Sequence, residues 1–247
     1  MIKRDETLED LQFDGLKIIQ KTSGYRFTTD AVLLANFVHG AKDKKVLEIG
    51  TGSGVIAILI TAKQSPKQVV GVEIQQEVYD MASRSVELNG LQDVIKLKNL
   101  DAKQLGVDYN ESFDIVVSNP PYRKVGSGMT QKQDDLCISR HEVALTLEEL
   151  FGIAKRTLKF GGSFYLVHQI ERLGEAFSLG GKYGLEPKEF CPILPRQNQP
   201  ANLFLARFVK GGKTGLKWVN PIVVFDEEGN YSVTVKQLYG DSFEVKK

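Results

Sequence analysis

Acidic side chains, alternating glycines and one amide occur in the first half of the sequence at spacings that suit the binding of a nucleoside. Glu48 stands just before Gly50, Gly52 and Gly54 in the segment VLEIGTGSG. Glycine adopts positive φ without steric cost, so this run lets the backbone approach a bound nucleotide closely. The spacing is GxGxG and not the dinucleotide pattern GxGxxG, which favours a small cofactor made of a nucleoside and an amino acid.

Two more carboxylates follow the next two predicted strands. Glu73 ends one strand, 19 residues after Gly54 (73 − 54), and Asp101 comes after the next. In open α/β sheets, ligands bind at the carboxyl ends of the strands. Glu73 is placed there to chelate both hydroxyls of a ribose, and Asp101 to accept a hydrogen bond from an adenine amine beside the Ala102 N–H. Each acid alone is typical of a solvated strand end, but three at successive ends indicate one site.

The segment Ser118-Asn119-Pro120-Pro121-Tyr122 directly follows a fourth predicted strand. A purely structural interpretation is a strand terminated by two prolines next to an incidental aromatic residue. However, the two prolines fix the backbone so that a carbonyl points outward beside an amide side chain. Two hydrogen-bond acceptors and an aromatic face form a receptor for a planar group that carries an NH₂.

The elements that position these residues alternate along the chain. Apolar strands that alternate with helices predict βαβ crossovers and a parallel sheet covered on both faces. We expect an antiparallel pair, 190–194 with 203–209, to close the sheet, and a further hairpin from 222–225 and 231–235. The other predicted strands are 45–49, 68–74, 94–97, 113–118 and 163–167, and the predicted helices are 28–38, 55–63, 75–89 and 147–158.

The composition excludes several classes of protein. The chain has 247 residues and a formal net charge of +1, from 32 basic and 31 acidic residues, which is typical of a soluble globular protein. Its two cysteines, Cys137 and Cys191, form no CxxC pair, so we expect neither a disulfide scaffold nor a metal site. The first residues contain no apolar signal region, and the most apolar stretch, 55–62, is too short to span a bilayer. We therefore expect a cytoplasmic protein.

Basic residues are concentrated in the second half of the chain. The segment 155–217 contains 11 basic and 4 acidic residues, which fits either a phosphate-attracting face or ordinary solvated surface. The segment 122–133 is rich in glycine and basic residues and reads either as a mobile lid or as a surface loop. Arg123 and Lys124 would meet phosphates there.

GTGSG, Glu73, Asp101 and NPPY, in this order, resemble the class I S-adenosylmethionine-dependent methyltransferases that methylate amino groups. The segment 27–34 (FTTDAVLL) is similar to the N-terminal cofactor segment of the bacterial tRNA(Val) adenine-N(6) methyltransferase family, and the resemblance covers about residues 8–240. It implies a Rossmann-like α/β fold with seven strands, mostly parallel, a closing antiparallel strand and a small C-terminal hairpin. It also implies one methyltransferase domain over 1–247, composed of a cofactor-capping segment (1–40), a catalytic core that binds S-adenosyl-L-methionine (41–210) and a hairpin extension (211–247).

The resemblance assigns roles to individual residues. Asn119 and the Pro120 carbonyl would accept the two hydrogens of the target amine, while Tyr122 stacks on its plane. No general base is implied, and His141 and His168 are interpreted as structural. The implied catalytic residues are Asn119, Pro120, Pro121 and Tyr122, and the implied substrate-binding residues are Tyr122, Arg123 and Lys124. The implied cofactor-binding residues are Thr29, Asp30, Glu48, Gly50, Thr51, Gly52, Gly54, Glu73, Ile74, Asp101, Ala102 and Asn119.

We therefore expect an enzyme that methylates the N(6) amine of an adenine in RNA, with a tRNA anticodon loop as the favoured substrate. The alternatives are guanine-N(2) methylation of ribosomal RNA, glutamine-N(5) methylation of a protein, and a non-catalytic RNA-binding protein on the same fold. Glutamine methyltransferases normally carry a helical domain before the cofactor fold, whereas fewer than 50 residues precede Gly50 here. Methylation of DNA adenine is disfavoured because no insert is large enough for a target-recognition domain. The expected partner is tRNA, without membrane or metal, and a monomer is the default state.

Overall fold

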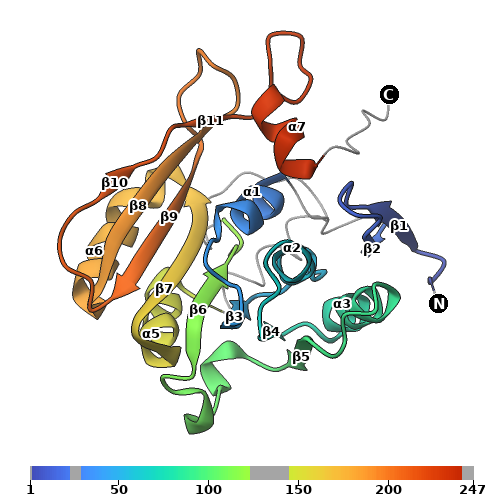
Figure 1. The fold of residues 1–247 in the computed structure, drawn as a ribbon, viewed down its shortest axis with the longest axis horizontal. Helices are drawn as coiled ribbons and strands as arrows, with labels where there is room; N and C mark the ends of the chain where they lie inside the picture. Colours follow the sequence, from blue (N-terminus) through green and yellow to red (C-terminus); the bar gives the residue numbers. More distant parts are fainter. Residues whose placement is uncertain (1, 23–28, 123–144, 241–247) are drawn as a thin grey trace, which may run out of the picture.

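The structure is a computed structural model that describes residues 2–22, 29–122 and 145–240. A nine-stranded sheet runs through its centre in the order β10-β8-β9-β7-β6-β3-β4-β5, and β11 also pairs with β8 (Figure 1). The strands of this sheet are β3 (Lys45–Ile49), β4 (Gln68–Glu73), β5 (Ile95–Asn99), β6 (Phe113–Ser118), β7 (Leu158–Gln169), β8 (Leu185–Leu194), β9 (Leu203–Lys210), β10 (Lys217–Trp218) and β11 (Ile222–Val223). The α-helices are α1 (Thr29–Phe37), α2 (Val55–Gln64), α3 (Gln76–Leu88), α5 (Leu147–Thr157), α6 (Leu173–Tyr183) and α7 (Val233–Tyr239).

The five strands from β3 to β7 run parallel to one another. Strand β9 is antiparallel to both β7 and β8, which confirms the predicted closing pair. Because parallel strands end at the same edge, the segments that follow β3, β4, β5 and β6 all meet at one edge of the sheet.

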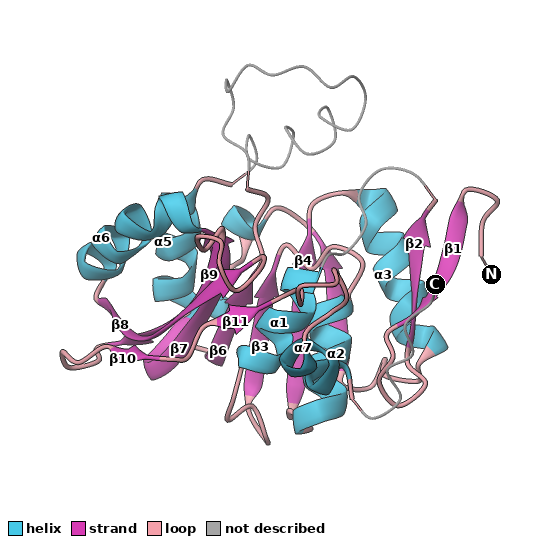
Figure 2. Cartoon of the chain, turned by 90° about the horizontal axis from the view of Figure 1, so that it is seen from above, coloured by secondary structure: helices cyan, strands magenta, loops and turns pink. Residues whose placement is uncertain are grey.

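Helices cover both faces of the sheet, and the central strands are therefore buried on both sides. In β3, Val46 belongs to the hydrophobic core with α1 and α2, whereas its neighbour Leu47 belongs to the core with α5 and α6. Figure 2 shows these two layers, with α5 and α6 on one side and α1, α2 and α7 on the other. A strand whose successive side chains enter two cores must be apolar throughout, which explains the unbroken apolar runs in the sequence.

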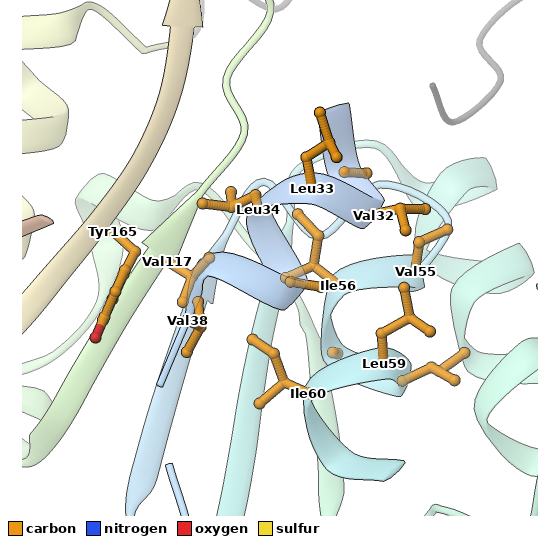
Figure 3. Close-up of a cluster of buried hydrophobic side chains, with 14 of the residues drawn as sticks. Val32, Leu33, Leu34, Val38, Val55, Ile56, Leu59, Ile60, Val117 and Tyr165 are labelled. Atoms are coloured by element: carbon orange, nitrogen blue, oxygen red, sulfur yellow. The ribbon is translucent and has the colours of Figure 1, made fainter. Parts of the chain in front are cut away.

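Helix α1 packs across α2, and this contact fixes the start of α1 over the sheet edge. Val32 and Leu34 of α1 and Ile56 and Ile60 of α2 are at most 3% exposed and lie in one core. Figure 3 shows the two helices with their apolar side chains turned toward each other, beside Val117 of the sheet. The first turn of α1, which contains Asp30, is thereby held next to the end of β6.

An N-terminal hairpin of β1 (Glu6–Asp10) and β2 (Lys17–Lys21) docks on α3. The Arg84 guanidinium of α3 makes two hydrogen bonds of 2.7 and 2.8 Å to the buried Glu6 carboxylate. The Ile19 N–H donates to the Ser85 hydroxyl at 3.0 Å. This hairpin and helix α6 have no counterpart among the predicted elements.

The sequence prediction was wrong in three details of the fold. The central sheet has nine strands and not seven, because the short strands β10 and β11 both add to β8. The strand predicted at 163–167 begins earlier, at Leu158, so Gly161 and Gly162 lie inside β7. The second arm of the predicted C-terminal hairpin is helix α7, because the Ser232 hydroxyl accepts the Val235 N–H at 3.2 Å and caps a helix there. Only the bridge between Phe225 and Tyr231 remains of the hairpin.

Candidate active site

A cleft of about 480 Å³ opens at the edge where β3, β4, β5 and β6 end. The cleft is lined by Ile49, Gly50, Val72, Glu73, Ile74, Leu100, Asp101, Ala102, Ser118, Pro120, Pro121 and Leu145. A smaller hollow shares Gly50 with it and extends to Ala31, Thr51, Ser53, Val55, Ile56 and Asn119. Residues from all three sequence signals thus meet at one place.

The glycine loop has the backbone conformation that its sequence requires. Gly50, Gly52 and Gly54 have φ angles of 74°, 57° and 93°, all in the left-handed region that side chains disfavour. Thr51 lies close against β4, and a Cβ at Gly71 would come within 2.5 Å of its Oγ1. Gly71 therefore leaves room for Thr51 of the glycine loop, a role that the sequence analysis missed. The sequence indicates it only by the position of a glycine inside an apolar strand.

Glu73 fixes the loop to the end of β4. Its carboxylate accepts the Gly52 N–H at 3.0 Å and the Gln75 N–H at 2.9 Å, and the residue is 4% exposed. A carboxylate accepts about four hydrogen bonds, so each oxygen retains capacity for one more donor. The same side chain can therefore hold the glycine loop and receive two hydroxyl groups of a ligand.

Glu48 is a buried carboxylate that has a raised pKa and lacks hydrogen bonds of normal geometry. It is 1% exposed, and neither of its oxygens makes a hydrogen bond of normal geometry to a described residue. Burial raises the pKa of Glu48 well above 4.5, the Ala57 N–H offsets part of this rise, and the nearby negative charge of Glu73 adds to it. Glu48 is thus a buried carboxylate with two acceptor atoms that no described donor meets in normal geometry, two residues before Gly50.

We expect a Glu48→Gln substitution to make the cofactor-free protein about 1–2 kcal/mol more stable at pH 8. Because the folded-state pKa of Glu48 is raised, its acid form stabilises the fold below pH 4.5, and this stability is lost as the pH rises toward the folded-state pKa. Glutamine carries no charge and removes this loss. Denaturant unfolding at pH 5 and pH 8 should show a gain that is larger at pH 8. The exposed Glu87→Gln serves as the control, and an equal gain at both pH values would contradict the prediction.

Asp101 and its neighbours form the far wall of the cleft. The Asp101 carboxylate accepts the Lys103 N–H at 2.9 Å and caps the short 3₁₀ helix η1 (Ala102–Gln104). Ile74, which is 43% exposed, lies on the cleft wall with Leu100 and Ala102. This part of the cleft is a mostly apolar slot with one carboxylate at its rim, which suits a flat heterocycle with an amine.

The Asn119 and Tyr122 side chains meet Asp30 of α1. The Tyr122 hydroxyl donates to the Asp30 carboxylate and lies 2.9 Å from Asn119 Oδ1. The Asn119 side chain also hydrogen-bonds to Asp30, and burial raises the pKa of Asp30 despite these hydrogen bonds. The structure therefore brings together the start of α1 and the segment after β6, which lie 89 to 92 positions apart (119 − 30, 122 − 30).

His168 lies behind Tyr122 with ring centroids 5.5 Å apart. It is 2% exposed, and burial lowers its pKa to about 4, so its imidazole is neutral near pH 7. Its Nδ1 accepts the Gln169 N–H at 2.8 Å. This neutral ring supports the Tyr122 ring, which agrees with the structural role expected for it.

Several predicted features fall outside the described residues. Arg123, Lys124 and His141 do, together with all but the first residue of 122–133, the segment predicted as either a mobile lid or a surface loop. Within 155–217, many basic side chains are paired: Lys159 with Asp114, Arg172 with Glu175, Lys182 with Glu148, Arg207 with Glu189 and Lys210 with Glu111. Acidic partners thus offset much of the basic bias in this stretch.

The described ranges, 2–22, 29–122 and 145–240, contain neither a metal-binding cluster nor a membrane-spanning helix. In these ranges no three His, Cys, Asp or Glu side chains lie where they could hold a metal ion. None of the helices that they contain has the length and apolar character needed to cross a bilayer.

Comparison with known proteins gives the family. The model of the methyltransferase small domain family matches residues 23–177. A protein of Histophilus somni named tRNA1(Val) (adenine(37)-N6)-methyltransferase is 26% identical over 237 residues, which cover 95% of this chain and 97% of the relative. A protein of the same name from Yersinia pestis is 29% identical over 216 residues, 87% of this chain and 86% of the relative.

Among solved structures, a predicted O-methyltransferase of Agrobacterium tumefaciens, protein Atu636, has the same fold. The two structures align with a TM-score of 0.67 at 21% sequence identity, and the alignment covers 85% of this chain and 94% of the Agrobacterium chain. The nine-stranded, mostly parallel sheet with helices on both faces is thus a methyltransferase fold. Together with the family match, which spans the glycine loop, Glu73, Asp101 and the end of β6, it identifies the chain as a member of the methyltransferase small domain family and an enzyme that depends on S-adenosyl-L-methionine.

Proposed function

We propose that this enzyme transfers the methyl group of S-adenosyl-L-methionine to the exocyclic N(6) amine of an adenine in tRNA, in the anticodon loop. The observation that carries the proposal is the arrangement of two half-sites at one sheet edge. The cofactor half contains Glu73 and Asp101, and the acceptor half contains Asn119 and Tyr122. The names of the relatives from Histophilus somni and Yersinia pestis support adenine in tRNA as the acceptor.

The residues of the cleft fit this cofactor. The unsatisfied Glu48 oxygens suit the side of the loop that faces the positively charged amino-acid end. The spare capacity of the Glu73 carboxylate suits two ribose hydroxyls, and the slot formed by Ile74, Leu100 and Ala102 beside Asp101 suits an adenine. We assign Gly50, Thr51, Gly52 and Gly54 to the loop against the methionine and ribose parts, with Thr29 and Asp30 closing over them.

On the acceptor side, Asn119 Oδ1 and the Pro120 carbonyl would accept the two hydrogens of the target amine. Pro121 fixes the backbone that presents them, Tyr122 would stack on the base, and Arg123 and Lys124 would contact its phosphates. The lone pair of an aromatic amine is delocalised into its ring, which makes the amine a poor nucleophile. Two acceptors outside the ring plane favour a pyramidal nitrogen and localise that lone pair.

The bound cofactor supplies a methyl group on a positively charged sulfur. Transfer is then an in-line displacement that depends mainly on positioning, a contribution of about 7–11 kcal/mol for well-oriented groups. No side chain needs to remove a proton beforehand, because the methylated nitrogen is acidic and releases its proton readily. The target base must leave its stack, which costs least in a single-stranded loop.

We further propose that the chain acts as one domain, with a capping segment (1–40), a catalytic core (41–210) and an extension (211–247), and that it works in the cytoplasm, where tRNA is modified. The nine-stranded sheet, which contains strands from 41–210 and from 211–247, supports one domain, and the separate β1-β2 hairpin docks on α3. The tRNA-modifying names of the relatives support the location.

The test incubates the protein with methyl-labelled cofactor and either total tRNA, ribosomal RNA or a release factor, and then identifies the labelled product. We expect labelled N(6)-methyladenosine from tRNA, and none when tRNA(Val) is offered with its anticodon-loop adenosines replaced. Labelled N(2)-methylguanosine or methylglutamine would overturn the assignment of the acceptor. Cofactor binding without transfer to any of the three would favour a non-catalytic RNA-binding protein.

A further inference from the structure

The C-terminal segment 222–240 covers the start of α1. Its Tyr231 ring is stacked between Phe225 and Tyr239, at centroid distances of 5.4 and 5.8 Å. The Ser232 hydroxyl donates to the Val223 carbonyl at 2.6 Å, and Lys63 of α2 donates to the Leu238 carbonyl at 2.6 Å. Tyr231 is therefore held from both sides, by its own segment and by the core of the enzyme.

The Tyr231 hydroxyl reaches Thr29, the first residue of α1, 202 positions earlier in the chain. The two hydroxyl oxygens lie 2.8 Å apart, in a partly buried position. The residue after Thr29 is Asp30, which is 6% exposed. Because Thr29 and Asp30 share the first turn of a helix, a hydroxyl that fixes one of them also limits the position of the other.

Asp30 in turn determines how the Asn119 amide is turned. An amide side chain can present either its oxygen or its nitrogen, and only the nitrogen can donate to a carboxylate. The hydrogen bond from Asn119 to Asp30 therefore fixes the nitrogen end and leaves Oδ1 as the acceptor, 2.9 Å from the Tyr122 hydroxyl. The orientation that an amine-methylating site needs is thus set by a residue of α1.

We propose that Tyr231 is a positioning residue of the acceptor site. Its hydroxyl holds Thr29, which places Asp30 against the Asn119 amide and the Tyr122 hydroxyl. The C-terminal segment then positions residues of the active site, although none of its own residues lines the cleft. The proposal rests on the proposed function, in which Asn119 Oδ1 receives the target amine.

The test removes only the Tyr231 hydroxyl, by Tyr231→Phe, which keeps the three-ring stack. We expect kcat to fall about 5–10-fold, the value of one neutral hydrogen bond, with a melting temperature lowered by no more than about 4 °C. Thr29→Val removes the other half of this hydrogen bond and also the hydrogen bond between Thr29 and Tyr239, so the double variant should lose no more than Thr29→Val alone. The matched control is Tyr183→Phe, whose hydroxyl donates to Glu148 at 3.3 Å on the α5–α6 side and should keep full activity.

A double-mutant cycle separates positioning from a general structural effect. If Tyr231 acts through the amide, Tyr231→Phe should change kcat less than about 2-fold in an Asn119→Ala background. A full 5–10-fold further loss there would overturn the proposal, as would an unchanged kcat for Tyr231→Phe alone.

A second readout needs neither cofactor nor acceptor. The side-chain amide signals of Asn119 in ¹⁵N-labelled protein can be identified by their absence from Asn119→Ala. They should shift in Tyr231→Phe and stay in place in Tyr183→Phe, and unchanged signals would refute the positioning. If the signals move but the wild-type enzyme methylates no adenine, the positioning stands and only the assigned acceptor is wrong.

Discussion

An Asn119→Ala enzyme should have a kcat about 10³-fold below that of the wild type and bind cofactor with a Kd within about 3-fold. The substitution removes one of two acceptors that act on the target nitrogen, and loss of one fixed polar group that acts in a transition state costs about 10²–10³-fold in other enzymes. It also removes the amide that contacts both the Tyr122 hydroxyl and the Asp30 carboxylate. Single-turnover methylation of tRNA with labelled cofactor measures the effect.

The control for Asn119→Ala is Asn110→Ala, which removes an exposed amide that binds Arg156 far from the cleft. This variant should keep wild-type turnover. If Asn119→Ala lost less than 10-fold in kcat, or if its loss lay entirely in cofactor affinity, the assigned role of the amide would be wrong.

A Glu73→Ala enzyme should bind the demethylated product, S-adenosyl-L-homocysteine, about 10²–10⁴-fold more weakly. Two hydrogen bonds to a charged group contribute about 1.5–3 kcal/mol each, and the variant loses both. It also releases the Gly52 N–H, which now donates to Glu73 at 3.0 Å, so the glycine loop loses its attachment to β4. Isothermal titration calorimetry of each variant gives the Kd.

Glu73→Gln keeps the shape and one acceptor oxygen, so we expect it to bind about 10–30-fold more weakly than the wild type. Glu77→Ala, at an exposed position in the first turn of α3, is the control for charge alone and should bind normally. A Kd for Glu73→Ala within 3-fold of the wild type would show that Glu73 holds only the protein backbone.

The sheet and the cofactor half of the site could be predicted because their determinants are local. Strand β4 is buried on both faces and apolar from Val69 to Val72, so the polar Glu73 marks its end. Strand β5 alternates apolar and lysine side chains, and Asp101 comes two residues after its last residue, Asn99. The glycine loop can also be recognised in the sequence, since three positive φ angles in five residues require glycine.

The C-terminal elements could not be predicted because local and tertiary signals compete there. The segment YSVTV alternates like a strand, yet Ser232 caps a helix in which Val235 and Tyr239 enter the core. The contact between Thr29 and Tyr231 joins residues 202 positions apart and leaves no trace in composition or periodicity. The ion pair between Glu6 and Arg84 likewise cannot be predicted from the spacing of these residues in the sequence.

The covering of α1 by the last elements of the chain has a consequence for biosynthesis. Of the described residues that line the cleft, all but Leu145 precede residue 122, whereas Tyr231 and Tyr239 leave the ribosome near the end of translation. A nascent chain would therefore contain nearly all of these cleft residues long before the segment that covers the start of α1 is made. Translation stopped shortly before Tyr231 would release a protein without the Val235 and Tyr239 side chains that complete the core beside α1.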